Sequence, residues 1–281
     1  METSKLSPIL KITKYTFIDE VQQRSFVIMF VVCALCVFLL RGCYQGNYMV
    51  NGQSLDAGTV VRTLSKATFH VIGAGVMVIA ALLSMRIFTR DRNEGVQSGI
   101  LSKAVARWQY VMGKILGVWV LSALFMFVLH SIVFLITSVN LKVIMPEYLL
   151  ASLLCSVNLL FVVVAVLLFS LLMPDIVAFL CVLGIGIVGF IADGIAAASQ
   201  SQIAQAIVRQ TAGHSQSDVT WWKVVYLFWP KLLGVQQTAS SLTESTSSHG
   251  FGTLYPFINV LIYCLMLGAL LFKQFRNEDI V

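Results

Sequence analysis

The chain has 281 residues, of which 58% are hydrophobic and 11% are charged, and its mean hydropathy is +0.86. A soluble globular protein carries roughly 25% charged residues, so this chain has too little charge to cover a surface that faces water. This composition excludes a soluble enzyme, a disordered chain and a small secreted module, and it predicts an all-α polytopic membrane protein.

The net charge and the cysteines exclude two further classes. The formal net charge is +6, but the 19 basic residues form no stripe interleaved with aromatic residues, so we expect no nucleic-acid partner. Positive charge is needed on the cytoplasmic face of a polytopic protein for its orientation. Five of the six cysteines lie inside apolar runs, which excludes a disulfide framework and predicts packing roles.

Residues 1–24 are predicted to form an amphipathic helix along the cytoplasmic membrane interface. The stripe that indicates it consists of Leu6, Ile9, Leu10, Thr13, Phe17 and Val21. Four basic residues and no small-residue cleavage site precede the first apolar core, so we expect an uncleaved anchor. Such a helix serves either as a plain anchor or as an elbow that braces the entrance of the bundle.

Six segments of the remaining chain, residues 25–281, are apolar enough to cross a bilayer, which takes about 20 residues. They lie near residues 25–40, 69–88, 115–139, 148–173, 176–198 and 254–275. Only Pro174 and Asp175 separate the fourth segment from the fifth, and proline cannot continue a helix. The sequence therefore predicts six transmembrane helices in one domain, with a tight turn between the fourth and the fifth.

The distribution of basic residues predicts the orientation. Twelve of the 19 fall in the N-terminal segment, the connection after the second span and the C-terminal tail, and seven fall in the other connections. Because positive charge concentrates on the cytoplasmic side, we expect both termini in the cytoplasm.

The longest connection, residues 199–253, is then extracytoplasmic. Its segment Trp221–Leu233 is apolar but only about 13 residues long, and it contains two lysines and a proline. We therefore predict an interfacial or re-entrant element there rather than a span. The serine- and threonine-rich stretch Gln236–Gly252 is predicted to be a flexible external loop.

The cytoplasmic connection over residues 89–114 is the most informative part of the chain. From Arg86 to Lys114 it mixes six basic and two acidic residues, with a glycine at Gly95 and an apolar pair at 100–101. Alternating charges on a short loop favour docking into a protein cleft. The alternative is an ordinary positively charged loop that only sets the orientation.

This connection resembles the corresponding loop of the permeases of type-2 ABC exporters. There the family commonly has an acidic residue and glycine, then leucine-leucine-serine, a proline-valine-serine-arginine run, and a tyrosine followed by glycine-lysine. The matching residues here are Glu94, Gly95, Ser102, Val105, Arg107, Tyr110, Gly113 and Lys114. Ala104 and Ala106 stand where the family has its proline and its second serine. The six spans, the amphipathic start and the aromatic-proline stretch 226–231 extend the resemblance over most of the chain.

The resemblance implies a bacterial inner-membrane permease subunit whose residues 90–99 form a coupling helix for a separate ATP-binding subunit. Its polar contacts would come from Arg90, Asp91, Arg92, Glu94 and Gly95. ATP and magnesium would be bound by that partner, since this chain lacks the G-x-x-x-x-G-K-[ST] pattern, and we expect no cofactor or enzyme activity in this chain. Six spans imply pairing with a second copy or with a related permease chain.

Polar residues inside the spans are candidates for a transport pathway, because they are costly in lipid. They are Asp193, His130 and Asn158. For Asp193 the alternative is a side chain that reaches the headgroups, and for His130 it is an interhelical hydrogen bond. The glycines in Gly184–Gly189 and the pair Gly113 and Gly117 are predicted to permit close helix approach.

Two other functions fit the same outline. One is a mechanical transmitter that acts on a periplasmic partner through residues 199–253 without transport. The other is a channel or carrier that needs no ATPase, which the few polar residues within the spans disfavour.

Overall fold

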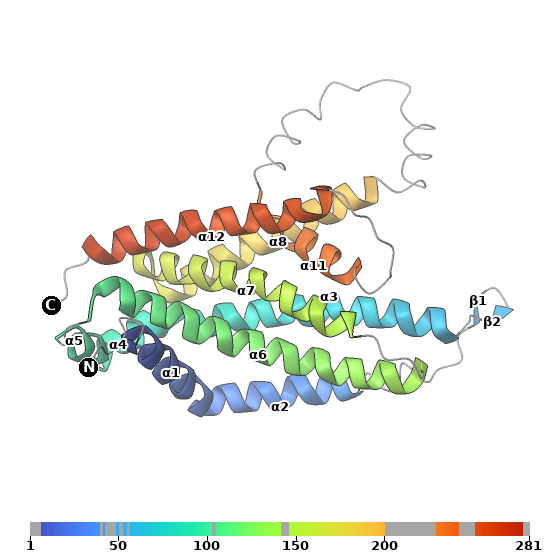
Figure 1. The fold of residues 1–281 in the computed structure, drawn as a ribbon, viewed down its shortest axis with the longest axis horizontal. Helices are drawn as coiled ribbons and strands as arrows, with labels where there is room; N and C mark the ends of the chain where they lie inside the picture. Colours follow the sequence, from blue (N-terminus) through green and yellow to red (C-terminus); the bar gives the residue numbers. More distant parts are fainter. Residues whose placement is uncertain are drawn as a thin grey trace, which may run out of the picture.

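A computed structural model of the chain describes residues 7–39, 42, 49–50, 53–54, 57–102, 105–141, 146–199, 229–241 and 251–277. Their fold is all-α, and its long helices lie side by side along the longest axis of the molecule (Figure 1). The helices are α1 (Ser7–Gln22), α2 (Arg24–Leu39), α3 (Ala57–Met85), α4 (Ile87–Asn93), α5 (Val96–Leu101), α6 (Arg107–Leu141), α7 (Glu147–Leu172), α8 (Asp175–Ser199), α11 (Leu232–Ser241) and α12 (Phe251–Asn277). A two-residue antiparallel pair, β1 (Met49–Val50) and β2 (Gln53–Ser54), lies at the end of the bundle opposite α4 and α5.

The chain is a multi-pass membrane protein by the length and apolarity of its helices. Five helices are long and apolar enough to cross a bilayer: α3 with α4, α6, α7, α8 and α12. A sixth span is counted when α1 and α2, which meet at a bend of 70°, are taken together. Each of the six predicted segments is helical, which confirms the predicted fold class. The helices α3 and α6 begin earlier than predicted, at Ala57 and Arg107, because polar residues continue both helices past their apolar segments.

The turn between the fourth and fifth predicted spans is confirmed. Helix α7 ends at Leu172, Met173 adopts an extended backbone, and α8 starts at Asp175 directly after Pro174. The hydroxyl of Thr89 on α4 donates a 2.8 Å hydrogen bond to the Asp175 carboxylate. This bond fastens α4 to the α7–α8 turn.

Helix α7 forms the centre of the bundle. It contacts α3, α4, α6, α8, α11 and α12, and its residues from Phe161 to Leu168 are all buried. A helix that is apolar on all sides belongs inside a protein or in lipid, and here neighbouring helices cover it. Helices α8 and α12 instead expose many large apolar side chains, such as Ile176 and Leu265.

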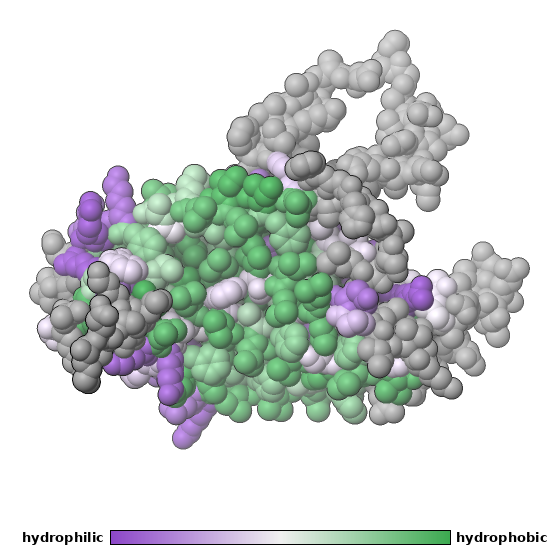
Figure 2. All heavy atoms as spheres, in the orientation of Figure 1, coloured by the Kyte–Doolittle hydropathy of each residue, from purple (hydrophilic) through white to green (hydrophobic). Residues whose placement is uncertain are grey.

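Apolar residues cover the middle of the face of the bundle that is seen in Figure 2. Figure 2 shows apolar residues across this face between the two ends, with hydrophilic residues gathered toward the ends. Apolar surface on this scale is expected of a protein that faces lipid.

The predicted N-terminal amphipathic helix is present as α1, which packs lengthwise on the first part of α6. Its buried row is Ile12, Thr16 and Glu20, whereas Leu10 of the predicted stripe is 62% exposed. Helix α1 therefore packs on α6 through residues such as Ile12 and Thr16, which are not in the predicted stripe. The contact of the stripe with the acyl boundary stays a prediction.

Two glycines of α6 allow this close packing. A Cβ at Gly113 would lie 2.6 Å from Ile12 Cγ2, and a Cβ at Gly117 would lie 2.7 Å from Thr16 Cβ. Both distances are shorter than van der Waals contact, so only glycine fits. The predicted close approach at this glycine pair is confirmed, and its partner is α1.

The prediction for the glycines of α8 is only partly confirmed. Gly189 lies against Trp229 and Pro230, but nothing lies within 4 Å of a Cβ built at Gly184 or Gly186. These two glycines do not support a close helix approach within the described part of the chain.

The prediction of a flexible loop over Gln236–Gly252 is wrong at both ends. Its last two residues, Phe251 and Gly252, begin α12. Residues 236–241 belong to α11, which packs among α3, α7, α8 and α12. Gln236 and Ala239 are buried because the neighbouring helices surround α11. Residues 242–250, like 200–228 with most of the predicted interfacial or re-entrant element Trp221–Leu233, lie outside the described residues. The described end of that element enters α11 inside the bundle.

Candidate functional site

The predicted coupling segment is built as two short helices, α4 and α5, which join the spans α3 and α6 at one end of the bundle (Figure 1). Gly95 separates the two helices with a φ of 68°, in the left-handed region that favours glycine. Its backbone N–H donates to Arg92 O and closes the last turn of α4. The glycine break in the sequence is thus a helix–helix corner.

The inward face of α4 carries a buried ionic contact with α6. The Asp91 carboxylate lies 2.5 Å from the ammonium of Lys114, and the two side chains are 2% and 0% exposed. The hydroxyl of Tyr110 also donates to Asp91. A buried charge is stable only when it is paired, so these three groups need one another.

Aromatic packing extends this contact to the last helix. Phe88 of α4 lies with its ring centroid 5.4 Å from that of Phe275 on α12, and Tyr110 stacks on Phe275 at 5.7 Å. All three side chains are buried. The inward face of α4 therefore contacts α6 and α12 together.

A second ionic contact joins α4 to the N-terminal helix. Arg90 forms ion pairs with Asp19 and with Glu20, the latter at 2.8 Å. The Glu20 side chain is 3% exposed, and α1 lies outside the five spanning helices. The guanidinium of Arg90 compensates the charge of this buried carboxylate. The sequence analysis did not identify Asp19 and Glu20 as partners of Arg90. Acidic residues beside the apolar stripe of an interfacial helix were a signal that a basic partner lies nearby.

The outward face of α4 and α5 consists of exposed residues. They are Arg92, Asn93, Glu94, Gly95, Ser98 and Gly99. We call this set the outer coupling face. The five predicted coupling residues are thus divided: Arg90 and Asp91 bind within the chain, whereas Arg92, Glu94 and Gly95 face outward. The contact with an ATP-binding subunit stays a prediction.

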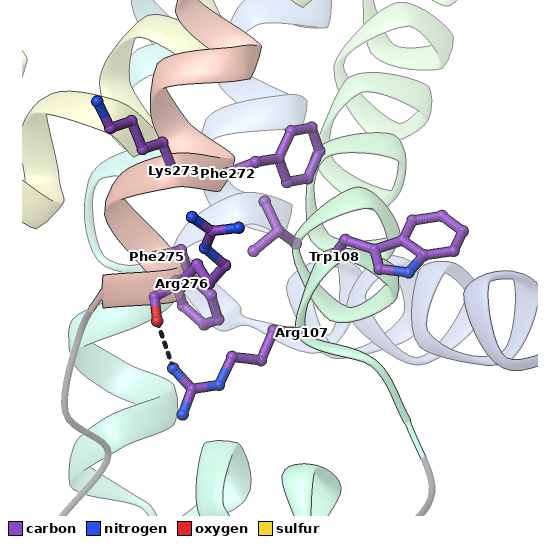
Figure 3. A pocket seen from close by; sticks show the side chains of 7 residues that line it. Arg107, Trp108, Phe272, Lys273, Phe275 and Arg276 are labelled. Atoms are coloured by element: carbon purple, nitrogen blue, oxygen red, sulfur yellow. Dashed lines mark hydrogen bonds between the residues drawn. The ribbon is translucent and has the colours of Figure 1, made fainter.

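A basic pocket of about 480 Å³ lies beside this site, between the first turn of α6 and the last turns of α12 (Figure 3). Arg107, Trp108, Lys273 and Arg276 are among its lining residues. Arg107 donates a 2.8 Å hydrogen bond to Arg276 O, which caps the end of α12. Cations at a helix C-terminus stabilise the helix dipole, which accounts for this cluster.

His130, a predicted pathway residue, bridges helices in the bundle core. Its Nδ1 lies 2.8 Å from Ser152 Oγ on α7, and its ring stacks on Phe69 with centroids 4.5 Å apart. The side chain is fully buried. The structure therefore contains the interhelical hydrogen bond that was the alternative to a pathway role for His130.

Asp193 and Asn158, the other two predicted pathway residues, hold the start of α11. The Asp193 carboxylate accepts from Gly234 N at 3.2 Å and lies 3.7 Å from Lys231 Nζ. The Asn158 amide donates to Leu232 O at 2.8 Å. Both side chains are buried, so Asp193 makes protein contacts. Asp193 and Asn158 therefore meet at the start of α11, whereas His130 contacts α7. A pathway role for the three residues stays a prediction.

Two further side chains attach α11 and were not predicted. Asn259 of α12 accepts from Lys231 N at 3.1 Å, and Gln236 Oε1 lies 3.3 Å from His70 Nδ1 on α3. A polar residue at a single position in an apolar run was the signal that could have found Asn259.

No family model matches this chain, and a search of curated proteins finds no match.

Proposed function

We propose that this chain is the membrane-spanning half of an ATP-driven export complex of the ABC type, and that its outer coupling face docks on a separate ATP-binding subunit. The observation that carries the proposal is the two-sided construction of α4 and α5. One side exposes opposite charges on Arg92 and Glu94, and the other is joined to α1, α6 and α12 through buried and partly buried contacts.

The buried contacts give the segment the stiffness that a lever needs. Arg90 joins α4 to α1, and Asp91 joins α4 to α6. Phe88 packs on Phe275 of α12. A displacement applied to α4 is therefore transmitted to several helices at once, because packed elements move as rigid bodies rather than deform continuously.

The exposed charges give the segment a means of recognition. Arg92 and Glu94 lie at the last turn of α4 and its cap, just before the Gly95 corner. Adjacent charges of opposite sign select a complementary surface and reject one of the wrong sign. A groove in a soluble subunit with the reverse charge order is the partner this surface fits.

ATP binding and hydrolysis in the partner would supply the energy, and two permease chains would enclose the pathway. When the two ATP-binding subunits close, they would push on the outer coupling face of each chain and bias the helices toward the releasing arrangement. The orientation with both termini in the cytoplasm, in a bacterial inner membrane, is part of this proposal. It is supported by the excess of basic residues at the α4–α5 end.

The test exchanges the two exposed charges with Arg92→Glu and Glu94→Arg in the same chain. We expect the protein to fold and to reach the membrane at normal levels, while ATP hydrolysis by the complex no longer responds to the permease. The matched control is Arg92→Lys with Glu94→Asp, which keeps both charges and should keep the coupling. Unaltered coupling in the exchanged variant would contradict the proposal.

A further inference from the structure

A second polar cavity lies at the end of the bundle that carries the β1–β2 pair, remote from the coupling site. Its volume is about 510 Å³, within the range of small-molecule sites. The lining residues come from the first turns of α3, the last turns of α6 and the start of α7: Thr59, Arg62, Thr63, Ser65, Lys66, Phe69, Phe134, Thr137, Ser138 and Tyr148. We call it the hairpin-end cavity.

The charge of this cavity is one-sided. Arg62 and Lys66 are separated by one helical turn, so their side chains are neighbours on α3 and repel each other. None of the described residues that line the cavity is acidic. An anion bound between the two side chains would attract both of them.

The positive-inside pattern does not account for these two cations. They lie at the end opposite α4 and α5, where basic residues are in the minority, and they are the sixth and tenth residues of a helix that is apolar farther on. Both residues belong to the polar first turns of α3 and line the cavity. The basic pocket at the α6–α12 end differs, because helix capping explains its cations.

The hydroxyl of Ser138 is a donor at the cavity wall that the described residues leave unused. Ser65 donates to Val61 O at 2.8 Å, and Thr137 lies 2.9 Å from Ser65 Oγ, so Thr137 is the donor in that contact. Ser138 Oγ is buried at the cavity wall and has no hydrogen-bond partner among the described residues. A buried hydroxyl without a partner costs free energy, and a ligand oxygen would remove that cost.

We propose that the hairpin-end cavity binds a phosphate group, held by Arg62 and Lys66 with Ser138 as an additional donor. Guanidinium offers two parallel N–H donors to phosphate oxygens, and an ammonium adds a point charge. Phe69 and Phe134 line the same space and supply apolar contact for the rest of the ligand. The phosphate could belong to a lipid headgroup, because basic pockets between membrane helices bind such groups, or to a soluble phosphate ester. This inference does not require an ATP-binding partner.

The test measures binding to the purified full-length chain in a neutral detergent by native mass spectrometry. The probes are dioctanoyl phosphatidylglycerol, the uncharged dioctanoylglycerol and sn-glycerol 3-phosphate. We expect one saturable molecule of phosphatidylglycerol and none of the uncharged lipid. Saturable binding of glycerol phosphate as well would assign the site to soluble phosphate esters, and binding of the lipid alone would assign it to a headgroup.

Variants identify the residues. Arg62→Gln with Lys66→Gln should weaken the first binding step at least tenfold, and Ser138→Ala should weaken it twofold to fivefold. The matched control, Lys14→Gln with Arg24→Gln, removes two exposed cations elsewhere and should bind normally. If no phosphate probe binds saturably, or if the cavity variant binds as tightly as the control, the proposal is wrong. If the double variant does not fold, the Ser138→Ala variant serves as the test. Unchanged phosphate binding by Ser138→Ala would then contradict the proposal that the cavity binds the phosphate.

Discussion

The Asp91 carboxylate on α4 lies 2.5 Å from the Lys114 ammonium on α6, and both side chains are buried. This pair connects the short segment between two spans to the helix that also carries α1. The pair lies on the inward face of α4, whereas Arg92 and Glu94 are exposed on the outer coupling face. The stability of this segment and the proposed recognition by a partner therefore depend on different faces.

Removing one member of this pair should destabilise the protein strongly. Lys114→Met leaves the Asp91 carboxylate buried without its cation, which costs about 3–5 kcal/mol. Adding Asp91→Asn to Lys114→Met removes both charges and should recover most of this loss. The measurement is the free energy of unfolding in detergent, and Asn93→Ala, on the exposed side, should change it by less than about 0.5 kcal/mol. Equal losses in the single and the double variant would contradict the assignment of the ion pair.

The glycine contact between α6 and α1 should be sensitive to one methyl group. Gly117→Ala places a Cβ 2.7 Å from Thr16 Cβ and should cost about 1–3 kcal/mol through forced displacement of α1. Amide hydrogen exchange in α1 should become faster. The control is Gly75→Ala on α3, where nothing lies within 4 Å of the added atom, and alanine there should leave exchange in α1 unchanged. Unchanged α1 exchange in Gly117→Ala would argue against the packing.

The attachment of α11 should depend on side chains from its neighbours. Asn158→Leu removes the side-chain donor to the Leu232 carbonyl and should cost about 0.5–1.5 kcal/mol. We expect faster hydrogen exchange for the amides of α11, whereas Gln237→Ala, at an exposed position of the same helix, should leave them protected. If α11 is equally protected in both variants, Asn158 does not hold it.

The spanning helices could be predicted from the sequence because apolar length is a strong and local signal. The tight turn at Pro174 was predictable because this proline stands between two apolar runs that are each long enough to span, and proline cannot donate the backbone hydrogen bond that would continue the first helix. The glycines at 113 and 117 indicated that another helix packs closely on α6. They did not indicate that this helix is α1, because the sequence of α6 does not specify its neighbour.

The candidate site was predicted as a segment but not as a geometry. The charge pattern located α4, but only the fold separates the buried Asp91 from the exposed Arg92, because facing depends on where α1, α6 and α12 pack. Asp193 and Asn158 were identified as costly polar residues, and their common role at α11 depends on a contact between distant parts of the chain. Periodicity cannot supply such contacts.

The most direct test of the proposed function is site-specific photocrosslinking from Asn93, an exposed residue of the outer coupling face, in native membrane vesicles. We predict a crosslinked product that contains an ATP-binding protein, and no such product from the matched exposed position Glu147 at the other end of the bundle. Capture of no ATP-binding protein from Asn93, or labelling of a cysteine at that position from outside the cell, would contradict the account.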